Sequence, residues 1–123
     1  MIDHTGVAIT DVAKSKAFYR AALAPLGYAV IMEFDDAVGL GVPPKPDFWI
    51  GKAAQRGTPI HVAFRAETRA QVDAFYKAAM AAGGKDNGAP GLRPHYHANY
   101  YGAFVLDPDG HNIEVVNHNR GRG

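Results

Sequence analysis

Apolar and polar residues alternate in two short segments that occupy matching positions in the two halves of the chain. The segment IDHTGVAI places Val7 and Ile9 on one face of an extended backbone, and PIHVAFRA does the same with Val62 and Phe64. A bulky apolar face of this kind packs against helices. Each segment is therefore predicted to form a strand whose other face, which carries one histidine, points away from the helices.

An internal repeat relates the two halves of the chain. The segment AFYRAALA begins at Ala17 and AFYKAAMA begins 57 residues later at Ala74, with six of their eight positions identical. The same offset carries His4 onto His61. A match that extends to a histidine outside the helices indicates a true duplication rather than chance similarity between two alanine-rich segments.

Each strand is followed by a predicted helix with its own start and stop signals. Asp11 is expected to cap a helix that runs through Ala24, and Thr68 with Gln71 forms a capping box before a helix that runs to Ala82. Glycines at positions 27, 83 and 84 supply the breaks at the C-terminal ends.

Three short strands are expected after each helix. They cover residues 28–34, 37–41 and 48–52 in the first half and residues 95–100, 102–107 and 112–117 in the second. The fold class predicted is therefore α+β, with two βαβββ modules in one domain of residues 1–123. Module one covers about residues 1–56, module two about 57–117, and residues 118–123 are predicted to form a flexible tail.

Composition excludes several kinds of function. Thirteen Lys and Arg against 12 Asp and Glu give a net charge of +1, which creates no field that would attract nucleic acid or an anionic membrane. The chain has no cysteine, so it has no disulfides and no thiolate chemistry. No apolar run approaches the length of a membrane span. We therefore expect a cytoplasmic protein whose partner is a small molecule.

Two familiar sites are also excluded by particular residues. The one serine, Ser15, lies in a helical segment, which does not suit the exposed nucleophile of a Ser-His-Asp triad. Gly39 and Gly41 resemble part of a dinucleotide-binding loop, but Pro43 and Pro44 follow and lack the backbone N–H groups that such a loop needs.

Three polar side chains are predicted on strand faces that point away from the helices. His4 and His61 share their faces with small residues, and Glu114 opposes Ile113 and Val115 in the last strand. If the two sheets curve into a shared trough, two imidazoles and one carboxylate meet there. This set suits Fe(II), Mn(II), Zn(II) or Ni(II). In the alternative, the strand histidines are hydrogen-bonded structural residues and bind no metal.

Four further residues are candidates for contact with a substrate. In the segment GLRPHYHANYY, His95 and His97 would share one face of a strand, and either could act as a general base or an additional metal ligand. Trp49 and Arg65 lie on the same strand faces as the predicted ligands, where they could wall the cavity or hold a carboxylate. The alternatives are a polar dimer interface or loop network, a packed core tryptophan, and a solvated arginine.

The sequence resembles the vicinal oxygen chelate superfamily, which contains glyoxalase I, extradiol dioxygenases, fosfomycin-resistance transferases and bleomycin-resistance proteins. The resemblance rests on DHTGVAITD with SKAFYRAAL, on HVAF, and on the closing DPDGHNIEVV. It implies paired βαβββ modules that form a curved, open mixed-sheet barrel with helices on the outer face, often completed across a homodimer. It also implies a divalent metal held by His4, His61 and Glu114.

Departures from the family patterns narrow the expected activity. Aligning Ile50 with Ile113 puts Gly51 opposite Glu114, so the four-ligand pattern of glyoxalase I is incomplete. In the extradiol pattern a tyrosine is expected where Phe104 stands.

The resemblance still leaves Tyr100 or Tyr101 to supply that hydroxyl group. The function expected is a metal-dependent lyase, isomerase or dioxygenase acting on a small oxygen-bearing metabolite, with His97 and Tyr101 as catalytic residues. The alternative is a metal-free sequestering protein in which Trp49, Tyr100 and Tyr101 stack on a planar ligand.

Overall fold

Two copies of one βαβββ unit make up the structure, a computed structural model that describes residues 1–119. In chain order the elements are β1 (Thr5–Ile9), α1 (Val12–Ala22), the 3₁₀-helix η1 (Ala24–Leu26), β2 (Ala29–Glu33), β3 (Ala37–Gly41), β4 (Phe48–Lys52), β5 (His61–Arg65), α2 (Arg69–Ala81), β6 (Lys85–Leu92), β7 (Tyr101–Leu106) and β8 (Asn112–Asn117). The strands form two four-stranded sheets in the orders β1-β4-β3-β2 and β5-β8-β7-β6. The predicted fold class is confirmed.

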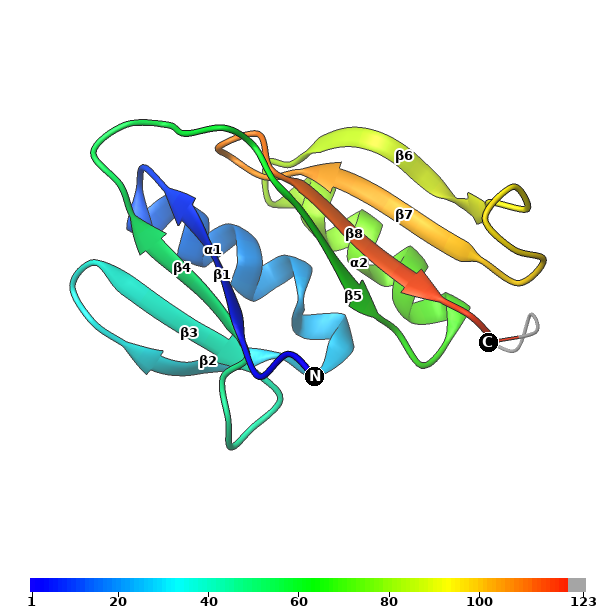
Figure 1. The fold of residues 1–123 in the computed structure, drawn as a ribbon, viewed down its shortest axis with the longest axis horizontal. Helices are drawn as coiled ribbons and strands as arrows, with labels where there is room; N and C mark the ends of the chain where they lie inside the picture. The colour runs from blue at the N-terminus through cyan, green and yellow to red at the C-terminus, as the bar shows by residue number, and fades with distance from the viewer. Residues whose placement is uncertain (120–123) are drawn as a thin grey trace.

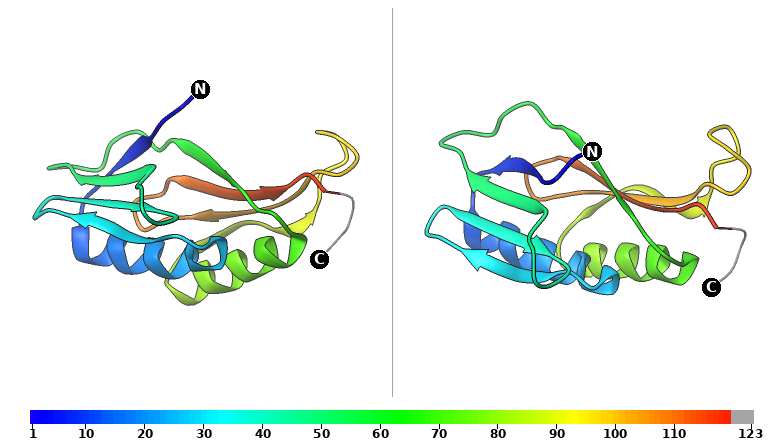
Figure 2. Two further views of the ribbon diagram at one scale, coloured as in Figure 1. Left: turned by 90° about the horizontal axis from the view of Figure 1, so that it is seen from below. Right: turned by 60° about the horizontal axis from the view of Figure 1, so that its bottom comes forward.

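The two sheets lie side by side, and both helices cover the same face of them (Figures 1 and 2). The core fills the space between the sheets and the helices, where Val7, Ile9 and Phe64 are buried as the alternation predicted. The sheets are not closed into a barrel, and their other face carries no helix. Side chains on this second face are therefore free to build a site.

Both helices begin at the predicted caps. The Asp11 carboxylate accepts a hydrogen bond from the Lys14 N–H at 3.1 Å, and Thr68 and Gln71 form the capping box. α1 ends at Ala22, earlier than predicted, because Pro25 cannot continue the helix and a 3₁₀ turn follows. Gly27 then takes φ 86°, a left-handed value that glycine adopts at little cost.

One strand prediction was wrong. Residues 95–100 form a loop, and the strand that pairs with β7 is β6, Lys85–Leu92. The loop is closed at its base by a hydrogen bond from the Arg93 N–H to the Tyr100 carbonyl at 2.7 Å. β6 has few residues of high strand propensity and its register with β7 shifts on both sides of Gly88, so pairing with β7 defines it rather than its own sequence.

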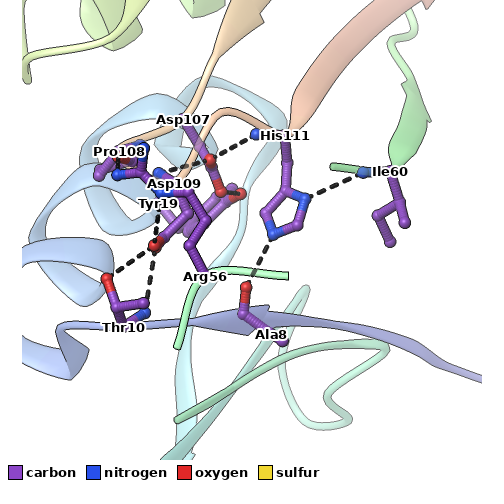
Figure 3. Close-up of polar contacts among 9 residues, drawn as sticks. All are labelled: Ala8, Thr10, Tyr19, Arg56, Ile60, Asp107, Pro108, Asp109 and His111. Carbon is purple, nitrogen blue, oxygen red and sulfur yellow. Dashed lines mark hydrogen bonds and ion pairs between the residues drawn. The ribbon is translucent and has the colours of Figure 1, made fainter. Parts of the chain in front are cut away.

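The turn between β7 and β8 joins the two modules (Figure 3). Asp107 accepts a hydrogen bond from the hydroxyl of Tyr19 on α1, and its other oxygen accepts the backbone N–H groups of Asp109 and His111 at 2.9 and 2.8 Å. Asp109 accepts from the side chain and the backbone of Thr10 at 2.7 and 3.2 Å. Both carboxylates are buried and tie module two to module one.

His111 continues this junction with its ring. Nε2 lies 2.7 Å from the carbonyl oxygen of Ala8 in β1, and Nδ1 accepts the N–H of Ile60 at 3.1 Å. A ring that donates through one nitrogen and accepts through the other is neutral, with its proton on Nε2. Asp107, Asp109 and His111 of the closing motif DPDGH therefore serve the packing of the two modules.

The predicted tail is described only in part. His118 contacts His97, and the Asn119 side chain donates to the carbonyl of Glu67 at 2.7 Å, so these two residues pack on the domain. Residues 120–123 lie outside the described residues. None of the helices in the described part of the chain is long and apolar enough to cross a membrane.

Candidate functional site

Glu114 is the centre of the site, because it is a buried carboxylate on the sheet face without helices. It pairs with Ala63 of β5 and Phe104 of β7, and the residue is 1% exposed. Oε1 accepts a hydrogen bond from His61 Nε2 at 2.8 Å, and Oε2 accepts one from the Tyr100 hydroxyl. These two donors compensate the loss of hydration that a buried carboxylate suffers. Burial and the bond to Glu114 raise the pKa of Tyr100.

Two pockets meet at His61. A pocket of about 640 Å³ contains Glu114 and has aromatic walls formed by Tyr96, Tyr100 and Phe104. A second pocket, of about 440 Å³, lies on the other side of His61 and contains His4 and Arg65. His61 lines both, so a ligand held at His61 and Glu114 could extend toward either.

His4 is not part of the His61–Glu114 contact. Its Nδ1 lies 2.8 Å from Asp3 Oδ1 on the surface, and Asp3 also pairs with Lys45. The hydrogen bonds from Lys45 and His4 lower the pKa of Asp3. Within residues 1–119 of a single chain, no three His, Cys, Asp or Glu side chains lie close enough together to hold a metal ion. The structure thus brings two of the three predicted ligands together and leaves the three-ligand set as a prediction.

The strand register corrects the predicted counterpart of Glu114 in module one. β1 pairs Gly6 with Trp49, and β5 pairs Ala63 with Glu114. Because the repeat offset of 57 residues carries Gly6 onto Ala63, the counterpart of Glu114 is Trp49 rather than Gly51. The conclusion about module one is unchanged, since an indole cannot replace a carboxylate as a metal ligand.

Trp49 and Arg65 lie on the face without helices. The Trp49 ring rests on Gly39, where an added Cβ would come within 2.8 Å of it, and stacks on Phe34 at 6.3 Å between ring centroids. Arg65 lines the pocket of about 440 Å³, and its side chain forms no ion pair within residues 1–119. The carboxylate that Arg65 might have neutralised, Glu114, is bound by His61 instead.

The loop after β6 supplies His95, His97 and Tyr100 to the larger pocket. His97 Nδ1 accepts the N–H of Asn99 at 3.1 Å, and its Nε2 lies 2.6 Å from His118 Nδ1, so both ring nitrogens are occupied. The His95 ring packs on Tyr96 at 4.2 Å and has no hydrogen bond to the described residues. His95 therefore differs from His61 and His97, the other imidazoles of this pocket, which each have a hydrogen bond to the described residues.

Tyr101 lies on the helix-covered face of the β5-β8-β7-β6 sheet. Its neighbours on that face of β7, Ala103 and Val105, belong to the core, and its hydroxyl donates to Asp73 of α2 at 2.6 Å. The hydrogen bond to Asp73 and burial raise the pKa of Tyr101. The catalytic role predicted for Tyr101 stays a prediction that its position does not favour.

Three residues of the larger pocket were missed by the sequence analysis: Tyr96, Phe104 and Asn112. A signal for Phe104 was available, since a tight turn at Asp107–Gly110 places it directly opposite Glu114 in the antiparallel pair. Nothing in the sequence indicated that the loop would fold Tyr96 toward the carboxylate.

Comparison with known proteins decides the family. A family model described as the glyoxalase/bleomycin resistance protein/dioxygenase superfamily matches residues 1–115. The chain belongs to this superfamily. A crystal structure of a superfamily member, a glyoxalase/bleomycin resistance protein from Albidiferax ferrireducens T118, is 30% identical with a TM-score of 0.84 and covers 97% of this chain and 99% of its own.

More distant members of the superfamily share the fold. A family enzyme from Burkholderia phytofirmans PsJN is 21% identical over 95% of this chain and 98% of its own, with a TM-score of 0.73. A lactoylglutathione lyase from Agrobacterium tumefaciens is 17% identical over 95% and 92%, with a TM-score of 0.72. A search of curated protein sequences found no match.

Divalent metals are common cofactors in this superfamily, and two of the predicted donors fit one here. An imidazole nitrogen and a carboxylate oxygen, 2.8 Å apart at the wall of an open pocket, are the donor types that Zn(II), Mn(II), Fe(II) and Ni(II) prefer. Tyr100 donates a hydrogen bond to the other oxygen of Glu114. A residue in this position orients a carboxylate ligand without touching the metal itself.

Proposed function

We propose that this protein is a divalent-metal-dependent enzyme that acts on a small oxygen-bearing metabolite, as a lyase, an isomerase or a dioxygenase. The observation that carries the proposal is the contact between His61 Nε2 and Glu114 Oε1 beside a pocket of about 640 Å³. The superfamily includes enzymes, which supports the same class of activity. We place this activity in the cytoplasm. The chain has no cysteine, so its fold does not depend on disulfides and needs no oxidising compartment.

Each residue of the site has a definite part in this proposal. His61 and Glu114 would hold the ion, which would supply Lewis-acid polarisation of adjacent substrate oxygens. Tyr100 keeps Glu114 Oε2 bonded, so that Oε1 faces His61. Tyr96 and Phe104 would cover an apolar part of the substrate and exclude water. His95 would hold or release a proton, because neither of its nitrogens is engaged within the described residues.

The third ligand in this proposal comes from a second copy of the chain. His4 lies on the N-terminal segment, which leads away from the helices on the face of the sheets that carries none (Figure 2). Two chains that met through this face in a two-fold dimer could bring His4 of one copy to His61 and Glu114 of the other. Apolar side chains exposed on β2 and directly after it, Met32 and Phe34, would be covered at the same time.

The proposal predicts metal in the purified protein. Protein purified without chelators should contain about one divalent ion per chain, measured by inductively coupled plasma mass spectrometry. After removal of the metal, adding Fe(II), Mn(II), Ni(II) or Zn(II) should restore occupancy and raise the melting temperature. Absence of metal that none of the four ions reverses would reject the metal-dependent enzyme.

The dimer is tested separately by mass. Light scattering at micromolar concentration should give the mass of two chains, and His4→Ala should reduce metal content without splitting the dimer. Mixing a His4→Ala chain with a Glu114→Gln chain in equal amounts should recover about a quarter of the sites. Random exchange makes about half of the dimers mixed, and only one of the two sites in a mixed dimer is intact. A mass of one chain would contradict the shared site.

A second function is favoured by one observation: Glu114 already has a hydrogen bond on each oxygen and needs no ion. In this alternative the protein binds a planar small molecule against Tyr96, Tyr100 and Phe104 and catalyses nothing. It predicts that His61→Ala leaves ligand affinity unchanged, whereas the metal-dependent enzyme predicts that the same change removes both metal and activity.

A further inference from the structure

A third pocket lies away from the His61–Glu114 site and gathers positive charge. It has a volume of about 330 Å³ and is lined by Lys14, Arg56 and Lys85, together with Gly83 and the β7–β8 turn. The three cations come from α1, from the segment between β4 and β5, and from the first residue of β6. The fold therefore assembles them from both modules, and the pocket shares no lining residue with the two pockets at His61.

Two of the three cations of this pocket, the lysines, have no carboxylate partner in the described part of the chain. Among residues 1–119, neither Lys14 nor Lys85 has a carboxylate within 4.0 Å. The nearby carboxylates of Asp107 and Asp109 are buried and accept their hydrogen bonds from Tyr19, Thr10 and the turn. Asp107 also lines the pocket and Asp109 lies 3.7 Å from Arg56, but three cations against these two carboxylates leave the pocket with an excess of positive charge.

Arg56 is held in place at the pocket. Its guanidinium donates to the carbonyl of Pro108 at 3.1 Å, and its Nε lies 3.7 Å from Asp109 Oδ1 (Figure 3). Both contacts engage one edge of the guanidinium, and a fixed guanidinium binds an oxyanion with less loss of side-chain entropy than a free one. Lys14 is the third residue of α1, so the positive end of the helix dipole adds to the same potential.

The pocket also has room beside its backbone. A Cβ added at Gly83 or at Gly110 would meet no atom within 4 Å. An ion the size of phosphate can therefore approach the backbone at Gly83 and Gly110 without a steric clash.

We propose that this pocket is a binding site for a phosphate group, either free or carried by a small metabolite. Lys14 and Arg56 bind it from module one and Lys85 binds it from module two. A phosphate here adds an ionic link between the modules next to the Asp107–His111 turn, so its binding stabilises the fold. The site is independent of the metal site and of the proposed enzymatic activity.

Inorganic phosphate tests the proposal directly. Metal-free protein, prepared on a chelating resin, is titrated with phosphate at constant ionic strength, with chloride as the balancing ion. The melting temperature should rise to saturation, and two-dimensional NMR should show shifts concentrated at residues around Gly83 and Gly110. Lys14→Gln and Lys85→Gln should each weaken phosphate binding about tenfold, the effect of losing one charge-assisted hydrogen bond.

Lys77→Gln is the matched control, because Lys77 is exposed on α2 and lines none of the pockets described. It should bind phosphate like the wild type, and so should Glu114→Gln, even if the metal proposal fails. A melting temperature that does not saturate with phosphate, or an equal loss of binding in Lys77→Gln, would reject the site in favour of general screening of surface charge.

Discussion

Glu114→Gln should lower metal affinity by at least about 100-fold, more than an outer residue of a metal site usually contributes. The change keeps the shape of the side chain but replaces an anionic oxygen donor by a weak neutral one. Only two imidazoles, His61 and His4 of the second copy, then remain to hold the ion, and without the anionic oxygen they hold it poorly. Competition with a fluorescent chelator measures the affinity, and metal content after dialysis gives an independent value.

The metal-free protein gives the second half of this test. Both oxygens of Glu114 accept hydrogen bonds, and the amide of Gln can accept only one of them. The metal-free variant should therefore be less stable than the metal-free wild type by about 1 kcal/mol, the usual value of one net hydrogen bond. Added metal should then stabilise the wild type strongly and the variant little.

Glu67→Gln serves as the control, since Glu67 is exposed and its side chain forms none of the hydrogen bonds in residues 1–119. It should match the wild type in stability and in metal content. If Glu114→Gln loses the same stability with and without metal, Glu114 is a structural acceptor for His61 and Tyr100. The metal-free binding protein then becomes the better account.

The sequence predicted the fold well wherever a residue's role depends on local pattern. Val7, Ile9 and Phe64 reach the core because strand alternation places them there, and Asp11 and Thr68 cap helices through their own backbone neighbours. The same alternation placed Glu114 on the face without helices, where it meets His61. These features need no knowledge of how distant segments pack.

The errors occur where pairing between distant strands decides the structure. β6 is a strand because β7 supplies its hydrogen bonds, whereas the histidines and tyrosines of residues 95–100 have strand-like side chains but no partner strand. Trp49 was misaligned by two residues for the same reason, since the register of β4 is set by β1 and not by its own sequence. Alternation still gave the correct face, because a shift of two residues preserves it.

The repeat in the sequence did not predict where the His4 side chain lies. Its place in the repeat equals that of His61, yet within residues 1–119 its ring meets Asp3 at the surface and not Glu114. The repeat gives each module a histidine at the same position, while Trp49 stands in module one where Glu114 stands in module two. In the dimer proposed above, a second copy of the chain would offer His4 a carboxylate of this kind.

Asp107→Ala should be the most destabilising single change at the junction of the modules, costing roughly 3–5 kcal/mol. The substitution leaves the buried Tyr19 hydroxyl and the N–H groups of Asp109 and His111 without acceptors. It also frees the turn that carries His111, and with it the link to β1. Chemical denaturation measures the free energy of unfolding, and this loss is a large part of the stability of a typical domain.

Repeat symmetry supplies the control for Asp107→Ala. Tyr76 occupies the position of Tyr19 in module two and donates to Asp86 at 3.1 Å, but this bond is exposed. Asp86→Ala should therefore cost far less than Asp107→Ala, because water replaces the acceptor that the Tyr76 hydroxyl and the Gly88 N–H lose. An equal loss in Asp86→Ala and Asp107→Ala would contradict the idea that burial makes the Asp107 junction costly to break.

A double-mutant cycle between Tyr19 and Asp107 tests whether the two side chains act together. In the wild type, Tyr19→Phe should cost about 1–2 kcal/mol, since it removes one buried hydrogen bond but leaves Asp107 two backbone donors. In the Asp107→Ala background the same change should be neutral or stabilising, because it removes a buried hydroxyl that has lost its acceptor. Additive effects would show that the two side chains do not act together, and that the link between the modules depends on His111 and Thr10 instead.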